Sequence, residues 1–273
     1  NRFFPIRLFF FLRKNRPDLI VVEEPRQMIA QFLIASLLRI PIIWHIHNEH
    51  QLTKYRPIFI KLYNTLFFRW LYVISDSSFV VISNLKFMKG KMVQELDRIP
   101  IIKSCTNLKE FDRDLKGIAF TIDLRKQIII GSVGRLVLQK GYEYLIESIS
   151  LLRKKLNINI KVLVAGDGIL KKSLQNQIKY SCLDDIFQFV GTKKDIAKFL
   201  SELDIYVQPS LSEAGGITVI EAMAFGLPIV ATKTGGILES IEDNRTGILV
   251  SPRSSMSLAN GIEKMIIMDY KQR

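Results

Sequence analysis

The hydrophobic pattern of the second half of the chain alternates between two periods. Short apolar runs rich in Ile and Val are typical of buried strands and occur at 127–134, 160–168, 186–191, 204–210, 227–232 and 247–252. The segments between them carry apolar residues at helical spacing and predict helices at 141–156, 169–182, 194–203, 217–224 and 236–241. Regular alternation of strand and helix indicates an α/β fold, with a parallel sheet covered by helices on both faces.

The first half of the chain follows the same alternation with fewer clear elements. Apolar runs predict strands at 16–25, 41–50 and 78–83, and the apolar segment after the first of them predicts a helix. Because the same alternation occurs in both halves, we expect two domains of similar build.

The boundary between the two domains is expected within residues 103–126, where clear periodicity is lost. We place a first domain at 1–114 and a second at 115–273. The chain begins with Asn1, and its first residues already have the pattern of a strand or helix. We therefore expect the first domain to be incomplete at its start.

Two apolar segments of the first half are candidates for contact with a membrane. The run 28–38 stops at Arg39, well short of the roughly 18 to 20 residues that a membrane-spanning helix needs. The segment IFIKLYNTLFFRWLYVI, at 58–74, is interrupted by Lys61 and Arg69. It predicts a helix that lies either in a core or on a membrane surface, with its cations at the polar edge.

The chain is basic, with a formal net charge of +13 at pH 7. Such a charge suits nucleic acid, an anionic lipid surface or a phosphorylated substrate. No arginine-rich arm, zinc-finger spacing or aromatic RNA-binding motif accompanies the charge, so we expect no nucleic-acid partner. Two cysteines, Cys105 and Cys182, are too few for a disulfide framework. They favour a cytoplasmic location, and peripheral attachment to the inner face of a membrane stays open.

Two cations follow the glycine that ends the predicted strand at 127–134. Gly134 lets the backbone approach a ligand, and Arg135 and Lys140 lie in the loop before the next helix. Because ligands of such sheets bind at the carboxyl ends of the strands, this pair predicts a clamp for a diphosphate. Two solvated surface charges are the competing interpretation. Gly166, in the AGDG turn, marks a similar close turn after the next strand.

The stretch EAGGITVIE places Glu213 and Glu221 around seven residues without charge. Gly215 and Gly216 precede the predicted helix, whose unpaired N–H groups favour an anion. A ligand across this helix start would offer its phosphates to the N–H groups and its hydroxyls to the two carboxylates, which are strong acceptors. Sugars and ribose have such hydroxyls. The alternative is that Glu213 complements the helix dipole and Glu221 is a solvated helix residue.

These motifs together resemble those of the family 4 retaining glycosyltransferases, whose signature is a glutamate, seven residues and a second glutamate. Here the signature reads EAGGITVIEAMAFGLPIVAT and is followed by GGILESIEDNRTGILV. GRLVLQKG is similar to the family's phosphate-binding segment, and AGDGILKKSL and FVGTKKDI are similar to its next two loops. The resemblance implies the GT-B fold, in which two Rossmann-like domains face a cleft.

The resemblance assigns roles to the candidate residues. Arg135 and Lys140 would hold the donor diphosphate and stabilise the charge on the leaving nucleoside diphosphate. Glu213 would bind hydroxyls of the transferred sugar, and Glu221 would bind the ribose. The other donor-binding positions implied are Gly134, Gly166, Val190, Gly191, Gly215, Gly216 and Ile217.

His47 ends the stretch PIIWHIH, where the family places a histidine at the junction of donor and acceptor. The resemblance makes it a candidate catalytic residue. His45 and His47 share one face of the predicted strand, so a metal pair is an alternative. A structural histidine is the commonest case and also stays open.

The reaction implied is hexosyl transfer with retention, from a UDP-, GDP- or ADP-sugar to a glycan or lipid-linked acceptor in polysaccharide biosynthesis. The leaving diphosphate would itself help to deprotonate the acceptor. No cofactor and no metal are expected. Two alternatives stay open: another GT-B enzyme, such as a sugar-nucleotide epimerase or a glycogen-synthase-like polymerase, and a non-catalytic fragment that binds nucleotide sugars.

Overall fold

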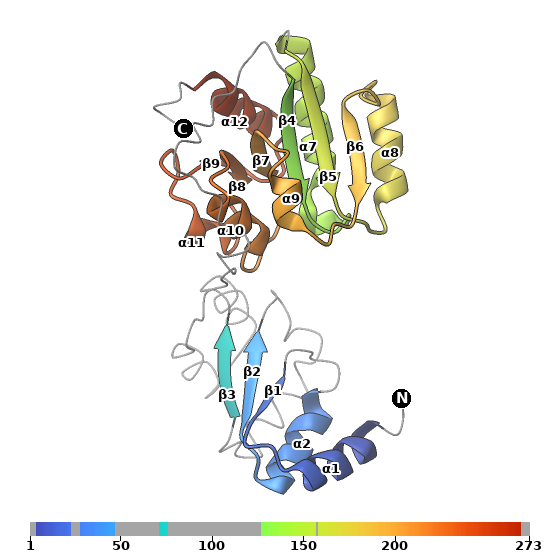
Figure 1. The fold of residues 1–273 in the computed structure, drawn as a ribbon, viewed down its shortest axis with the longest axis vertical. Helices are drawn as coiled ribbons and strands as arrows, with labels where there is room; N and C mark the ends of the chain where they lie inside the picture. Colours follow the sequence, from blue (N-terminus) through green and yellow to red (C-terminus); the bar gives the residue numbers. More distant parts are fainter. Residues whose placement is uncertain (1–3, 23–27, 47–70, 76–126, 157, 269–273) are drawn as a thin grey trace. The chain divides into compact units, whose positions relative to one another are not determined.

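The computed structural model describes residues 4–22, 28–46, 71–75, 127–156 and 158–268 (Figure 1). The chain divides into two compact units, 1–104 and 105–273. The domain boundary predicted after residue 114 and the strand predicted at 78–83 lie outside the described residues.

The described residues of the first unit form a three-stranded parallel sheet and two helices. Its strands pair in the order β1 (Ile20–Val22), β2 (Ile42–Ile46) and β3 (Leu71–Ser75). Its helices are α1 (Phe4–Asn15) and α2 (Met28–Leu38), which pack against each other. Residues 71–74 were predicted as the end of a helix and belong to β3 instead. Strands of parallel sheets commonly read as near-continuous apolar runs, without the alternation that would distinguish a strand from a buried helix.

The second unit is built on a six-stranded parallel sheet (Figure 1). The strands are β4 (Ile128–Val133), β5 (Ile160–Ala165), β6 (Phe187–Gly191), β7 (Ile205–Gln208), β8 (Ile229–Thr232) and β9 (Ile248–Val250). Their order is β6-β5-β4-β7-β8-β9, so the order reverses at β4, which pairs with both β5 and β7. This is the order of doubly wound folds, whose ligands bind beside the reversal at the carboxyl ends of the strands.

Helices cover both faces of this sheet (Figure 1). They are α7 (Tyr142–Lys155), α8 (Lys171–Tyr180), α9 (Ile196–Leu200), α10 (Ile217–Ala224), α11 (Ile237–Ser240), α12 (Ser255–Ile267) and the short 3-10 helix η2 (Leu138–Lys140). The core on one face contains Ile128 and Ile130 with α7, α8 and α12. The core on the other contains Val133 and Tyr206 with α9, α10 and α11. The strands and helices predicted between 127 and 252 are all present, and α12 was not predicted.

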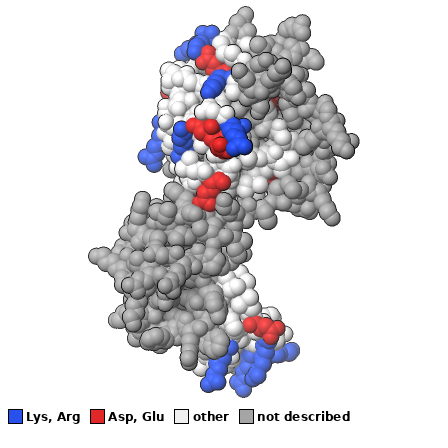
Figure 2. All heavy atoms as spheres, turned by 90° about the vertical axis from the view of Figure 1, so that its left-hand side faces the viewer, with Lys and Arg blue, Asp and Glu red and all other residues white. Residues whose placement is uncertain are grey.

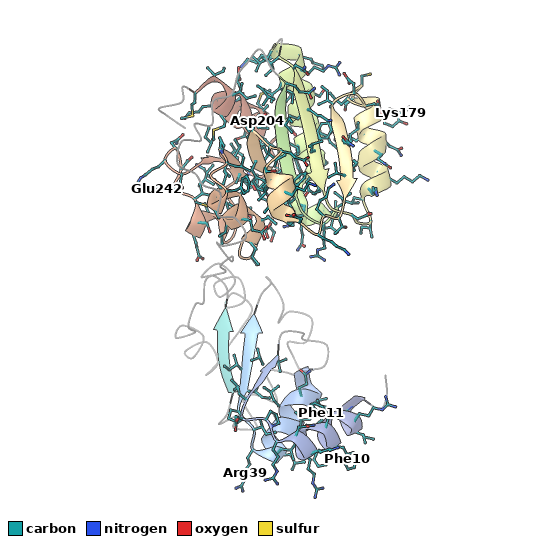
Figure 3. All side chains as sticks on the ribbon, viewed as in Figure 1. Phe10, Phe11, Arg39, Lys179, Asp204 and Glu242 are labelled. Carbon is teal, nitrogen blue, oxygen red and sulfur yellow. The ribbon has the colours of Figure 1, made fainter. Side chains whose placement is uncertain are left out.

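Among the described residues, charge is distributed differently over the two units. Figure 2 shows acidic and basic side chains side by side on the second unit, and opposite charges are paired there, as in Lys233 with Asp243. Basic side chains gather at the exposed end of the first unit in Figure 2. Phe10, Phe11 and Arg39 lie in the helical part of that unit (Figure 3), and both Phe side chains are 61% exposed. No helix within the described residues is long and apolar enough to cross a membrane.

Candidate functional site

The loops after β4, β5 and β6 are joined to one another by backbone hydrogen bonds. Gly134 N donates to Ala165 O (3.0 Å), and Gly166 N donates to Gly191 O (2.9 Å). These bonds join the carboxyl ends of β4, β5 and β6. Gly166 has a φ of 150°, and a Cβ on it would lie 1.9 Å from Gly134 O, so the close approach of these loops requires glycine.

The two cations of the loop after β4 have different surroundings. The side chain of Lys140 is 16% exposed, and its Nζ lies 2.5 Å from Glu213 Oε2. Arg135 is exposed, and its side chain has no hydrogen bond or ion pair with any residue that the structure describes. The predicted clamp therefore consists of one cation that is already paired and one that is available to a ligand.

Glu213 lies in the loop between β7 and α10 and is held from several sides. Its Oε2 accepts a hydrogen bond from Ser210 Oγ (3.0 Å) in addition to the ion pair with Lys140. Its backbone carbonyl accepts from Gly236 N (2.9 Å), in the loop after β8. With its side chain only 14% exposed, the carboxylate has a defined orientation.

The Lys140–Glu213 ion pair joins the two loops that flank the reversal of strand order. β4 and β7 are direct neighbours in the sheet, and their loops also touch through the backbone. Gly141 has a φ of 61°, and a Cβ on it would lie 2.2 Å from Pro209 O. The predicted cation loop and the predicted carboxylate thus meet at the position where doubly wound sheets bind their ligands.

Behind Glu213, the carboxyl end of β7 is polar and buried. Gln208 Nε2 donates to Ser210 Oγ (2.8 Å), and Tyr206 OH and Thr218 Oγ1 donate to Gln208 Oε1 at 2.6 and 3.1 Å. Sequence reasoning did not assign these four residues to the site. The sequence DIYVQPS did contain an indication of this, because the polar residues Gln208 and Ser210 follow directly on the apolar part of the strand.

Two further buried hydroxyls lie near Gly134. Tyr142 OH would be 2.9 Å from a Cβ on Gly134. Burial raises the pKa of the Tyr142 phenol well above its ordinary value, Ser132 opposes this, and the Glu213 carboxylate adds to it. Among the described residues, neither the Tyr142 nor the Ser132 hydroxyl has a partner at the distance and angle of a hydrogen bond. Because such a group is costly to bury alone, a water or a polar ligand atom would be stabilised here.

The second glutamate lies on the helix that the two glycines precede. Gly215 and Gly216 end the loop, and α10 begins at Ile217, whose side chain is 50% exposed. Glu221 lies one turn further along the helix and is partly buried. Both glutamates therefore lie near the start of α10, Glu213 before it and Glu221 within it.

The remaining predicted residues are spread more widely. Val190 is partly buried near the end of β6, and Gly191 follows it, where a Cβ would meet no atom within 4 Å. The backbone at Gly191 therefore borders open space. His47 lies outside the described residues. The parts of the chain that the structure describes contain no group of three or more His, Cys, Asp or Glu side chains that could hold a metal ion.

The fold and this arrangement define a class of protein. It is a doubly wound α/β protein with charged loops at its switch point, the place where the strand order reverses. The chain belongs to the family described as glycosyl transferases group 1, which matches residues 120–273. An uncharacterized glycosyltransferase of Methanocaldococcus jannaschii is 31% identical over 179 residues, 62% of this chain and 45% of the relative. The alpha-D-kanosaminyltransferase of Streptomyces kanamyceticus is 24% identical over 248 residues, 86% of this chain and 64% of the relative. The chain thus spans less than two thirds of either relative.

Solved structures identify the fold as GT-B, as the sequence predicted. The crystal structure of Anabaena HepE in complex with UDP-glucose matches this chain with a TM-score of 0.80 and 20% sequence identity. The match covers 98% of this chain and 73% of HepE. The predicted resemblance to glycosyltransferases is confirmed at the level of the group 1 family.

Proposed function

We propose that the protein is a retaining glycosyltransferase that moves a hexosyl group from a nucleoside-diphosphate sugar to a glycan or lipid-linked acceptor in polysaccharide biosynthesis. The observation that carries the proposal is the Lys140–Glu213 ion pair at the switch point. A nucleotide sugar has a diphosphate directly bonded to a polyhydroxylated ring. A cation and an acceptor carboxylate that lie 2.5 Å apart suit those two adjacent groups.

In this proposal the loops divide the donor between them. Arg135 and Lys140 bind the diphosphate, and the guanidinium of Arg135, which is exposed, suits a bidentate contact. Glu213 accepts hydrogen bonds from sugar hydroxyls, and Glu221 accepts them from the ribose. The backbone of the glycine loops lies near the phosphates and base.

The chemistry would proceed on one face of the sugar. The bond between the anomeric carbon and the β-phosphate oxygen breaks, and its electron pair stays with the diphosphate. The acceptor oxygen bonds to the same face of the anomeric carbon, and its proton goes to the leaving diphosphate. Arg135 and Lys140 stabilise the negative charge that develops there, which is the role that a metal ion fills in other transferases. We therefore propose that transfer needs no metal and continues in the presence of EDTA.

The direct experiment is a thermal-shift screen of the chain against UDP-, GDP- and ADP-sugars, in which UDP-glucose is the first choice because HepE was crystallised with it. Transfer is then measured with radiolabelled donor and a lipid extract, with and without EDTA. A thermal shift and labelled product support the proposal. A shift without transfer favours a non-catalytic binder, interconversion of the bound sugar favours an epimerase, and the absence of any shift contradicts all three.

A separate observation supports attachment of the first unit to an anionic membrane surface. The side chains of Ile6, Phe10 and Phe11 on α1 are 57 to 61% exposed, and the helix ends in Arg13 and Lys14. Apolar side chains beside cations are typical of helices that lie in the headgroup region. We propose cytoplasmic, peripheral attachment, and expect sedimentation with phosphatidylglycerol vesicles but not with phosphatidylcholine vesicles. Equal sedimentation with both would contradict the role of the cations.

A further inference from the structure

The buried hydrogen bonds behind Glu213 have a fixed direction. Gln208 Oε1 accepts from Tyr206 OH and Thr218 Oγ1, and Gln208 Nε2 donates to Ser210 Oγ (2.8 Å). A serine hydroxyl has a single proton to donate. Since Ser210 Oγ already accepts from the amide, its proton goes to Glu213 Oε2, 3.0 Å away. The last group of the network, the Ser210 hydroxyl, therefore donates its hydrogen bond to the Glu213 carboxylate.

Three residues of the network are closed to solvent, Thr218 is partly buried, and the hydrogen bonds have one low-energy arrangement. Tyr206, Gln208 and Ser210 are all 0% exposed. Burial raises the pKa of the Tyr206 phenol well above its ordinary value, so its OH remains a donor at physiological pH. A buried amide or hydroxyl without a partner is costly, and here each has one. Reversing any bond would leave two donors or two acceptors facing each other.

Ser210 is also fixed through its backbone. Thr232 Oγ1 donates to the Ser210 carbonyl oxygen (2.5 Å), which ties it to the end of β8. Pro209 restricts the backbone immediately before it. Ser210 therefore stays in place if the Glu213 side chain moves, and it acts as the fixed point of the pair.

Oε2 of Glu213 receives two donors of different character. One is Lys140 Nζ (2.5 Å), on a flexible side chain for which a bound diphosphate would compete. The other is Ser210 Oγ, which is buried and cannot reach a ligand. The second oxygen, Oε1, has no hydrogen-bond partner among the described residues.

We propose that Ser210, supported by Gln208, is a positioning residue for Glu213. It holds Oε2 when Lys140 turns to the diphosphate, so that Oε1 remains available to the hydroxyls of the donor sugar. The inference rests on the proposed function and adds two residues that determine how tightly the sugar part of the donor is held.

The test is a double-mutant cycle of Ser210→Ala and Glu213→Gln, with UDP and UDP-glucose affinities measured by calorimetry on the intact chain. If the thermal-shift screen selects a nucleotide with another base, that nucleoside diphosphate and its glucose derivative replace UDP and UDP-glucose. Ser210→Ala should lower the UDP-glucose affinity about tenfold, the size expected for a hydrogen bond to a charged group, and change UDP affinity less than about twofold. In the Glu213→Gln background, the same substitution should cost clearly less, because the neutral amide oxygen accepts a weaker hydrogen bond from Ser210 than the carboxylate does.

Ser148→Ala is the matched control. Ser148 is also 0% exposed and donates one hydrogen bond, from Oγ to Leu145 O (2.8 Å), but it lies within α7 and outside the network. The substitution Ser148→Ala also removes a serine hydroxyl from a fully buried position, and it should leave the affinities for UDP and UDP-glucose unchanged. A loss equal to that of Ser210→Ala would mean that any buried hydroxyl affects binding, which overturns the proposal.

Two further outcomes separate the inference from the proposed function. If Ser210→Ala weakens UDP and UDP-glucose equally, or costs the same factor with and without Glu213→Gln, Ser210 has only a structural role and the inference fails. If the wild type binds no nucleotide sugar, the proposed function fails, and with it the sugar-binding role of the network. Melting temperatures of the wild type, the two single variants and the double variant test the contact itself without ligand, because additive losses would overturn the coupling of Ser210 to Glu213.

Discussion

The loop after β4 and the loop after β7 lie side by side where the strand order reverses, but their functional side chains are held in different ways. The first is fixed by backbone hydrogen bonds from Gly134 to Ala165 and from Leu136 to Asp167. The second also has backbone hydrogen bonds, from Leu211 to Gln139 and from Gly236 to Glu213, but its carboxylate is fixed in addition by buried side chains, with Ser210 bonded directly to Glu213. One loop therefore supplies long cationic side chains on a rigid backbone, and the other supplies a carboxylate whose own orientation is set.

The difference matches the two kinds of ligand group that a nucleotide sugar would present. A diphosphate can be met by cations from several directions, because its charge is spread over many oxygens. A sugar hydroxyl must be met at a defined angle and distance, because a single hydrogen bond depends on both. A loop with a fixed backbone and long cationic side chains suits the first requirement, and a loop whose carboxylate is itself held by a buried hydroxyl suits the second. The predictions below test this division.

The largest effect is expected where the two loops touch. Gly141→Ala should destabilise the protein by roughly 2–4 kcal/mol, because it adds strain at a φ of 61° to a clash 2.2 Å from Pro209 O. Gly191→Ala is the control, since its φ is 70° but a Cβ there would meet no atom within 4 Å. It should cost only about 1–2 kcal/mol. Denaturant unfolding measures both, and equal losses would show that contact between the loops is unimportant.

The two cations should affect binding alike and stability differently. Arg135→Ala and Lys140→Ala should each weaken nucleoside-diphosphate binding by roughly 10- to 150-fold, since a hydrogen bond to a charged group contributes about 1.5–3 kcal/mol. Only Lys140→Ala should also lower the free energy of unfolding, because it removes the cation beside the partly buried Glu213. Calorimetry and unfolding on the same samples test this. Unchanged affinity with the fold intact would remove these residues from the site.

The two glutamates should separate the nucleotide from the sugar. Glu221→Gln should lower the affinity for free nucleotide about tenfold, because its proposed partner is the ribose. Glu213→Gln should leave nucleotide affinity nearly unchanged and reduce sugar transfer. Titration calorimetry with the nucleotide and a radiolabel transfer assay give the two readouts. Equal effects of both substitutions on nucleotide affinity would contradict the division of labour.

The smallest effect concerns the exposed carboxylate of Asp243, which contrasts with the buried hydroxyl of Ser210. The backbone N–H of Leu249, and then Lys233, hold the pKa of Asp243 below its ordinary value. A lowered folded-state pKa means that the stabilisation is present above the unfolded pKa of about 3.9 and is lost as pH falls through the folded value. Asp243→Asn should therefore cost less than about 1 kcal/mol at pH 7 and nothing near pH 2. Unfolding curves at both pH values test this, and a difference that persists in acid would exclude the carboxylate as its source.

Local pattern was sufficient for the second unit and less so for the first. In the second unit, strands such as Ile128–Val133 are bounded by glycine turns and amphipathic helices, so each element has a clear start and end. In the first unit, the long apolar stretch up to residue 74 was interpreted as one helix, although Leu71–Ser75 is a strand. Strands of parallel sheets commonly read as near-continuous apolar runs, so the sequence has no alternation that would distinguish such a strand from a helix.

The sequence by itself determined the α/β class, the glycine turns at the carboxyl ends of the strands, and the candidate residues Arg135, Lys140, Glu213 and Glu221. Only the tertiary structure decided which of these meet. Lys140 pairs with Glu213, 73 residues away, because β4 and β7 are adjacent in the sheet and their loops meet. The order of strands follows from the packing of helices on both faces of the whole sheet, which no local segment encodes. For the same reason, the polar residues of DIYVQPS could be seen in the sequence, but their direction toward Glu213 could not.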